Sequence, residues 1–194
     1  MLEIQQKIRN CKRCPLHKDM PDGCHPVPGI GPHDSKIVIV GEALGENESI
    51  MEEPFVGRAG ELLNKILKDC NLSRENDVYI SNMVKCRPTK NNGKSNRPPT
   101  SDEIQSCKIW IWSELKKLQP KVIITLGAVA SKTLLKLKPS TSMKSIVGIA
   151  KYVDYIGSTI VPCYHPSYLL QHGRDKLEET KEHFAFARSV LDEL

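Results

Sequence analysis

Three short runs of β-branched residues, each ending at a glycine or an asparagine, constrain the fold of this chain more than any other feature. They are residues 35–41 (SKIVIVG), 77–82 (DVYISN) and 121–127 (KVIITLG), and each has the length and character of a buried strand. A helical pattern follows the first run, because residues 57–70 place their apolar side chains on one face. Strands that alternate with helices predict an α/β fold: a three-layer α/β/α sandwich with a central, mostly parallel sheet.

The rest of the chain carries similar signals. Thr100 and Glu103 have the spacing of a capping box, which marks the start of a helix. Residues 152–165 are typical of two strands around a Gly-Ser turn. Helices are expected over residues 100–119, 128–137 and 175–194. Residues 87–99 and 11–34 are polar and rich in Pro, Gly, Asn or Lys, so both are expected to be long loops.

Composition limits the class of protein. The chain has 194 residues, which suits a single domain, 1–194. No apolar stretch approaches the roughly 20 residues that a membrane-spanning helix needs. The start of the chain lacks the apolar core of a secretory signal, so a cytoplasmic protein with reduced thiols is expected. A formal charge of +5 permits nucleic-acid binding without indicating it.

Several polar residues follow the predicted strands. Glu42 comes after the first strand, Asn82 ends the second, and His165 follows the last. Parallel sheets bind ligands beyond the carboxyl ends of their strands, so these residues are expected to meet at one rim. The turn after residue 41 lacks the G-x-G-x-x-G and Walker patterns, and its glutamates would repel a phosphate. Taken alone, it is most simply a solvated surface turn.

The seven cysteines form no disulfide framework, because their number is odd and the expected compartment is reducing. Cys11 and Cys14 have the spacing of a metal-binding pair, with a redox dithiol as the competing interpretation. Cys86 and Cys107 are the natural second pair, and Cys24 is an alternative ligand. From spacing alone, tetrathiolate zinc is slightly favoured over an iron–sulfur cluster. The other two cysteines, in apolar surroundings, are expected in the core: Cys70 and Cys163.

Several segments, taken in order, resemble the family 4, iron–sulfur type of uracil-DNA glycosylase. They are CKRC near the start, GEALGENES followed by EPFVGRAGELL, YISNMVKCRP, a cysteine in the next helix, PKVIITLG and YHPSYLL. The resemblance covers most of the chain and implies a DNA repair enzyme that excises uracil. It also implies a [4Fe-4S] cluster, which reverses the preference for zinc. The implied cluster ligands are Cys11, Cys14, Cys86 and Cys107.

The resemblance implies a role for each group at the rim. Phe55 would stack on the extruded uracil, Asn82 would read its polar edge, and His165 would donate a hydrogen bond to O2 of the leaving base. Glu42 would place the water or oppose the positive charge that develops on the sugar. Glu48 is the second candidate for this role of Glu42.

Further contacts with the DNA are expected near this rim. Gly41 and Ala43, which flank the catalytic glutamate, are expected to bind uracil. The turn that ends at Gly45 is expected to exclude the methyl group of thymine. Three arginines are candidates for phosphate contacts, with a solvated surface position as the alternative for each: Arg58, Arg87 and Arg174.

The chain departs from the family pattern in three places. Leu44 stands where the family usually has proline, and Ser49 where an aspartate is common; these changes are expected to loosen the turn or alter the substrate range. Residues 89–96 (TKNNGKSN) look like an insertion between two cysteines. An insertion in a loop is thermodynamically mild, so the cluster is expected to survive it.

Two alternatives to a glycosylase remain. A covalent uracil-DNA-binding protein would use a loop histidine to trap the sugar, but residues 83–99 contain none. A non-catalytic module with a metal-stapled fold would depend on the cysteines and not on Glu42 or His165. The expected enzyme acts as a monomer on uracil-containing DNA, single- or double-stranded.

Overall fold

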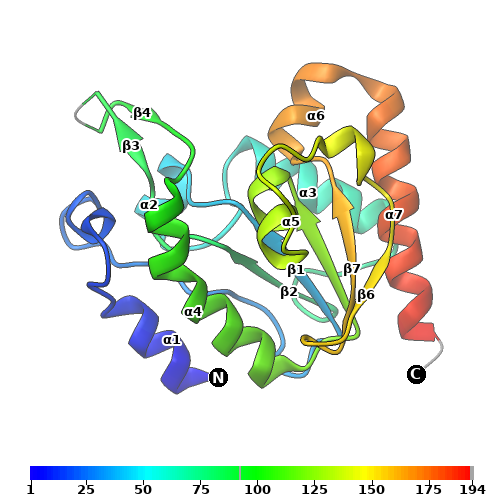
Figure 1. The fold of residues 1–194 in the computed structure, drawn as a ribbon, viewed down its shortest axis with the longest axis horizontal. Helices are drawn as coiled ribbons and strands as arrows, with labels where there is room; N and C mark the ends of the chain where they lie inside the picture. Colours follow the sequence, from blue (N-terminus) through cyan, green and yellow to red (C-terminus); the bar gives the residue numbers. More distant parts are fainter. Residues whose placement is uncertain (92, 193–194) are drawn as a thin grey trace.

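The computed structural model describes residues 1–91 and 93–192, with a five-stranded sheet at the centre (Figure 1). The strand order is β2-β1-β5-β7-β6. Neighbouring strands run parallel except at one edge, where β6 is antiparallel to β7. The strands are β1 (Ile37–Gly41), β2 (Val78–Asn82), β5 (Val122–Leu126), β6 (Lys151–Val153) and β7 (Ser158–Cys163). The prediction of a mostly parallel sheet is confirmed.

Alternation along β1 divides the core into two halves. Ile37 and Ile39 pack against α3 (Arg58–Asp69) and α7 (Arg174–Asp192) on one face of the sheet. Val38 and Val40, on the other face, pack against helices α4 (Ser101–Leu118) and α5 (Ala128–Leu134). Successive side chains of a strand point to opposite faces, so a strand covered on both sides is apolar throughout. The three-layer α/β/α sandwich is confirmed.

The sheet topology places the carboxyl ends of four strands at one rim. From β1 the chain moves to β2 on one side and then to β5 on the other, so the strand order reverses between β1 and β5. Ligands bind at such a switch point in open α/β sheets. The register pairs Gly41 with Asn82 and Leu126 with Cys163. Glu42, Asn82 and His165 therefore emerge on the same side of the molecule.

Several short elements were not predicted. Part of the expected loop 87–99 is a hairpin that extends away from the sheet in Figure 1, and part of the acidic turn is helical. The additional elements are α1 (Leu2–Arg9), α2 (Glu46–Met51), α6 (Pro166–His172), 3-10 turns at Pro15–Lys18 and Met143–Ser145, and hairpin strands β3 (Thr89–Lys90) and β4 (Ser95–Asn96).

Predicted helix boundaries differ from the structure at two places. The helix expected over 128–137 ends at Leu134, and Lys136 then adopts a positive φ of 52° that a helix cannot continue through. The last helix begins at Arg174, and its expected end at 193–194 lies outside the described residues. None of the described helices has the length and apolar character needed to cross a membrane.

Candidate active site

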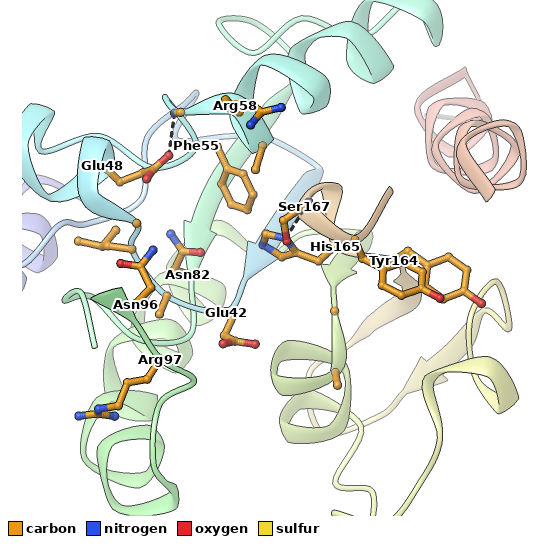
Figure 2. Close-up of a pocket in the computed structure, with 18 of the residues that line it drawn as sticks. Glu42, Glu48, Phe55, Arg58, Asn82, Asn96, Arg97, Tyr164, His165 and Ser167 are labelled. Carbon is orange, nitrogen blue, oxygen red and sulfur yellow. Dashed lines mark hydrogen bonds between the residues drawn. The ribbon is translucent and has the colours of Figure 1, made fainter. Parts of the chain in front are cut away.

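A cavity of about 740 Å³ opens at the rim of the sheet. Four side chains from separate parts of the chain line it: Glu42, Phe55, Asn82 and His165. Figure 2 shows them around one opening, with the ring of Phe55 near the imidazole. The structure thus brings together groups that lie more than 100 residues apart in the sequence.

Backbone pairing continues past the ends of β1 and β2 and aligns the first two of these groups. The amide of Met83 donates to the Gly41 carbonyl (3.0 Å), and the amide of Val84 donates to the Glu42 carbonyl (3.0 Å). Glu42 and Asn82 consequently follow adjacent strands at the same level.

Gly41 makes room for the site. A Cβ atom there would lie 2.3 Å from Asn82 Oδ1 and 2.5 Å from the ring of Phe55, so only glycine fits. Gly41 lies behind these two side chains, whereas Ala43, the other predicted contact, lines the cavity directly.

Phe55 is held in an unusual conformation. Its φ is +57°, a left-handed value that costs a non-glycine residue of order 1 kcal/mol and persists only where neighbours enforce it. Arg74 Nη1 donates to the Phe55 carbonyl (2.9 Å), and Nη2 donates to the carbonyl of Pro54. The ring centroid lies 5.8 Å from that of His165, at an interplanar angle of 31°. The ring is buried and fixed beside the imidazole.

Glu48 supports the same loop. Its Oε1 accepts from the amides of Val56 (3.0 Å) and Gly57 (2.8 Å). The carboxylate predicted as a substitute for Glu42 is therefore engaged in holding the segment that carries Phe55. Neither this contact nor that of Arg74 has a sequence signal, because both join residues through the fold and not through a spacing.

Asn82 presents a buried acceptor without a donor. Its Oδ1 has no hydrogen-bond partner among the described residues, and its exposed fraction is only 3%. A buried polar atom left unpaired costs about 1–3 kcal/mol, so such an atom in a cavity wall marks a place for a ligand donor.

His165 has a defined tautomer. It caps the N-terminus of α6, and its Nδ1 accepts from the Ser167 amide (3.2 Å). A backbone N–H can only donate, so Nδ1 is unprotonated and the neutral ring carries its proton on Nε2. Burial lowers the pKa of His165 to about 4, against a weaker opposing effect of the Glu48 charge. The imidazole is therefore a neutral donor near pH 7.

Burial shifts the pKa of Glu42 in the opposite direction from that of His165. Burial raises the pKa of this carboxyl above its usual value of 4.5. A carboxylate with reduced hydration interacts strongly with a positive charge or with the proton of a water molecule placed against it.

The predicted arginines differ in position. Arg58 lines the cavity. Arg87 is buried, and its guanidinium binds the side chains of Asn96 (2.7 Å) and Glu46 (3.5 Å), so this charge serves an internal contact. The side chain of Arg174 lies outside the described residues.

Four cysteines border a second, small pocket. Cys11 and Cys14 come from the N-terminal segment, Cys86 from the segment after β2 and Cys107 from α4. The indole Nε1 of Trp110 donates to Cys11 Sγ (3.1 Å), and the amide of Lys85 donates to Cys107 Sγ (3.3 Å). The alternative ligand Cys24 is not in this group, and its Sγ lies 4.0 Å from the Ile50 carbonyl.

The surroundings of these thiols bear on whether they would hold a metal centre. Burial raises the pKa of Cys14 and Cys86, and raises that of Cys107 to about 11, so unliganded thiolates would be costly there. A single zinc ion needs sulfurs ~3.8 Å apart, given Zn–S bonds of ~2.3 Å. Among residues 1–91 and 93–192 no three potential ligands are grouped closely enough for one ion. Four soft sulfur donors around one pocket suit a metal centre, either zinc or an iron–sulfur cluster.

The structure shows where the two cysteines predicted for the core lie, and what surrounds the two residues that depart from the family pattern. Cys70 and Cys163 are buried in the main core, as expected. Leu44 is buried beside Val84, and its amide donates to the Cys86 carbonyl (3.4 Å), a bond that proline could not make. Ser49 donates to the Glu46 carbonyl (2.7 Å). Each residue therefore makes a hydrogen bond in or next to the turn.

Comparison with known proteins finds uracil-DNA glycosylases among the relatives of this chain. The family model described as the Uracil DNA glycosylase superfamily matches residues 28–191. A type-4 uracil-DNA glycosylase of Thermotoga maritima is 37% identical over 175 residues, covering 90% of this chain and 85% of that protein. One of Archaeoglobus fulgidus is 36% identical over 184 residues, covering 93% and 87%. A type-5 uracil-DNA glycosylase of Pyrobaculum aerophilum is less similar, at 28% identity over 210 residues, covering 93% and 88%.

Proposed function

Because this chain belongs to the type-4 uracil-DNA glycosylases of the Uracil DNA glycosylase superfamily, we propose that it hydrolyses the N-glycosidic bond of uracil in DNA. The products are free uracil and an abasic site. The whole chain acts as one glycosylase domain, as a monomer, on uracil-containing DNA in the cytoplasm.

The observation that carries this proposal is the unpaired Oδ1 of Asn82. A base inside a duplex cannot be reached, so the nucleotide rotates out into the cavity. There the N3–H of uracil donates to Oδ1, while the ring of Phe55 stacks on the base. Cytosine has no proton on N3, so it would leave the acceptor unpaired and face it with another acceptor.

Bond cleavage separates charge, and the two ends of the cavity suit the two charges. As the bond between C1′ and N1 breaks, its electron pair passes to the uracil ring. The Nε2–H of His165 donates to O2 of the departing base. The Glu42 carboxylate opposes the positive charge on the sugar and orients the water that attacks C1′. Removing a single preorganised donor of this kind typically costs ~3 kcal/mol in the barrier.

A [4Fe-4S] cluster is the cofactor that the four grouped thiols fit, with zinc as the less suitable occupant. When bound, it supplies a covalent cross-link between the N-terminal segment, the segment after β2 and α4. The donors from Trp110 Nε1 and the Lys85 amide support thiolate ligands. The Leu44 amide donates to the Cys86 carbonyl, and this bond joins the cysteine pocket directly to the turn that carries Glu42.

The test is release of free uracil from a uracil-containing oligonucleotide under single- and multiple-turnover conditions. The native protein is expected to turn over many times. Glu42→Gln and His165→Ala are expected to slow the single-turnover rate about 100-fold each while remaining folded. Two exposed residues serve as matched controls, and their variants should keep the native rate: Glu61→Gln and His33→Ala.

The alternatives give different results in the same assay. A non-catalytic module would bind the oligonucleotide and release no uracil. A covalent binder would remain attached to the DNA on a denaturing gel. Native rates in both the Glu42 and His165 variants would refute the assignment of these residues.

A further inference from the structure

A buried ion pair borders the cysteine pocket, because Lys85 is one of the residues that line this pocket. Lys85 Nζ lies 2.6 Å from Glu114 Oε2, and the exposed fractions of the two side chains are 1% and 0%. Glu114 belongs to α4, whereas Lys85 follows β2. Neither side chain lines the active-site cavity, so the proposed chemistry does not use them directly.

The pair is the centre of a complete hydrogen-bond network. Glu114 Oε1 accepts from the Gly29 amide (2.8 Å) and the Tyr79 hydroxyl (3.2 Å). Ser81 Oγ donates to Glu114 Oε2 (2.8 Å) and accepts from Lys85 Nζ (2.5 Å). Each of these groups is buried, so the network has one well-defined arrangement.

The network holds both ends of the short segment that joins the two sites. Ser81 immediately precedes Asn82, and Lys85 immediately precedes Cys86. The backbone of Lys85 is also fixed, because its amide donates to Cys107 Sγ (3.3 Å) and its carbonyl accepts from Val27 (2.7 Å).

Stability alone does not account for such a pair. A buried ion pair is often no more stabilising than apolar residues of the same volume, because both charges lose their hydration. Its specific contribution is geometric, since the charges fix positions that apolar packing would leave less defined.

We propose that Lys85 and Glu114 are a positioning pair that sets the orientation of the Asn82 amide relative to the cysteine pocket. This inference rests on the proposed function, in which Asn82 reads uracil. The pair acts through Ser81 at one end of the segment and through the Lys85 backbone at the other. The site that reads the base and the site that holds the cluster are thereby built as one unit.

The test uses the iron-loaded protein and a neutral replacement of the pair. In Lys85→Met/Glu114→Gln, the glutamine still accepts from Gly29 and Tyr79 and donates to Ser81, while the charges are gone. Each single variant leaves one buried charge and is expected to lower the melting temperature by about 10 °C; the double variant should recover most of this loss. Iron content and visible absorbance of the double variant should match the native protein.

The decisive readout is inhibition of the glycosylase by free uracil. The double variant is expected to raise the inhibition constant about 10-fold, equivalent to ~1.4 kcal/mol of binding. Asn82→Ala should raise it as well. In an Asn82→Ala background, the Lys85/Glu114 replacement should change it less than twofold, because both changes act on one contact. A merely structural pair would leave uracil inhibition at the native value, or would add its effect to that of Asn82→Ala.

The outcomes separate this inference from the proposed function. If the native protein releases no uracil, the proposed function fails. If it releases uracil but Asn82→Ala leaves inhibition unchanged, the role of Asn82 is wrong, and the positioning role with it. If Asn82→Ala weakens inhibition and the double variant does not, only the positioning role is wrong. If the double variant loses its iron, the Ser81→Ala variant is used instead, because it keeps both charges. Weaker inhibition by uracil in Ser81→Ala then supports the positioning role, and unchanged inhibition contradicts it.

Discussion

At the residue scale, the site pairs groups whose surroundings change their protonation in opposite directions. Burial keeps His165 neutral, and the Ser167 amide fixes its proton on Nε2. Burial also raises the pKa of Glu42, which makes this carboxyl a better proton acceptor than an exposed glutamate. A neutral donor and a basic carboxylate therefore coexist near pH 7.

This difference predicts the acid side of the pH profile. As the pH falls, Glu42 gains a proton at a pH above 4.5, whereas His165 gains one only at about 4. The single-turnover rate should therefore decline first through Glu42, with a midpoint above 4.5. In Glu42→Gln the rate should be low and nearly independent of pH down to that point. A native profile that stays flat to pH 4.5, or a Gln variant that keeps the decline, would contradict this assignment.

At the scale of elements, the loop that carries Phe55 depends on a close approach to α3. A Cβ atom on Gly60 would lie 1.9 Å from the Phe55 carbonyl oxygen, which is backbone and cannot move independently. The Arg74 and Glu48 contacts hold the same loop from the other sides.

Gly60→Ala is accordingly expected to displace the Phe55 loop, although alanine favours helices. We expect weaker uracil inhibition and a melting temperature lower by about 5 °C, since overpacking costs about 1–3 kcal/mol. The neighbouring exposed variant Glu61→Ala is the control and should match the native protein. Calorimetry and uracil inhibition provide the measurements; a Gly60→Ala protein that behaves like the control would exclude the close contact.

The elements also show what the sequence could predict. The strands were predictable because a parallel sheet buried on both faces leaves continuous β-branched runs, as in Ile37–Gly41. Helix α4 was predictable because its capping box is local, and both bonds of that box are present. Helix α6 was missed because it is short and is capped by His165, an unusual capping residue. The hairpin was missed because its two strands have two residues each.

The candidate site likewise contains residues that the sequence predicts and residues that it does not. Glu42, Phe55, Asn82 and His165 were assigned from segments that resemble a family, and parallel topology explains why they meet. Arg74, Glu48 and the Lys85–Glu114 pair were out of reach, because each acts through contacts between distant segments that leave no pattern in the sequence.

At the scale of the whole molecule, the cluster proposed for the cysteine pocket would cross-link distant parts of the chain. Cys14 and Cys86 are separated by about 70 residues. A cross-link that closes a loop of this length stabilises a protein by about 4 kcal/mol in the chain-entropy model.

Loss of iron should therefore lower the melting temperature by about 10 °C. Cys86→Ser is expected to lose the visible absorbance and to show this shift. Cys24→Ser, outside the pocket, is the matched control and should retain both iron and stability. Equal iron loss in the two variants, measured by metal analysis, would show that the wrong cysteines have been assigned.

One cavity is inferred to hold an extruded uracil between four side chains: Phe55, Asn82, Glu42 and His165. A crystal structure of the protein with its product, free uracil, tests it most directly. In that structure, N3 of uracil should lie within hydrogen-bond distance of Asn82 Oδ1, with the ring stacked on Phe55 and O2 facing His165 Nε2. Uracil bound elsewhere, or bound in the cavity with Asn82 Oδ1 still unpaired, would contradict it.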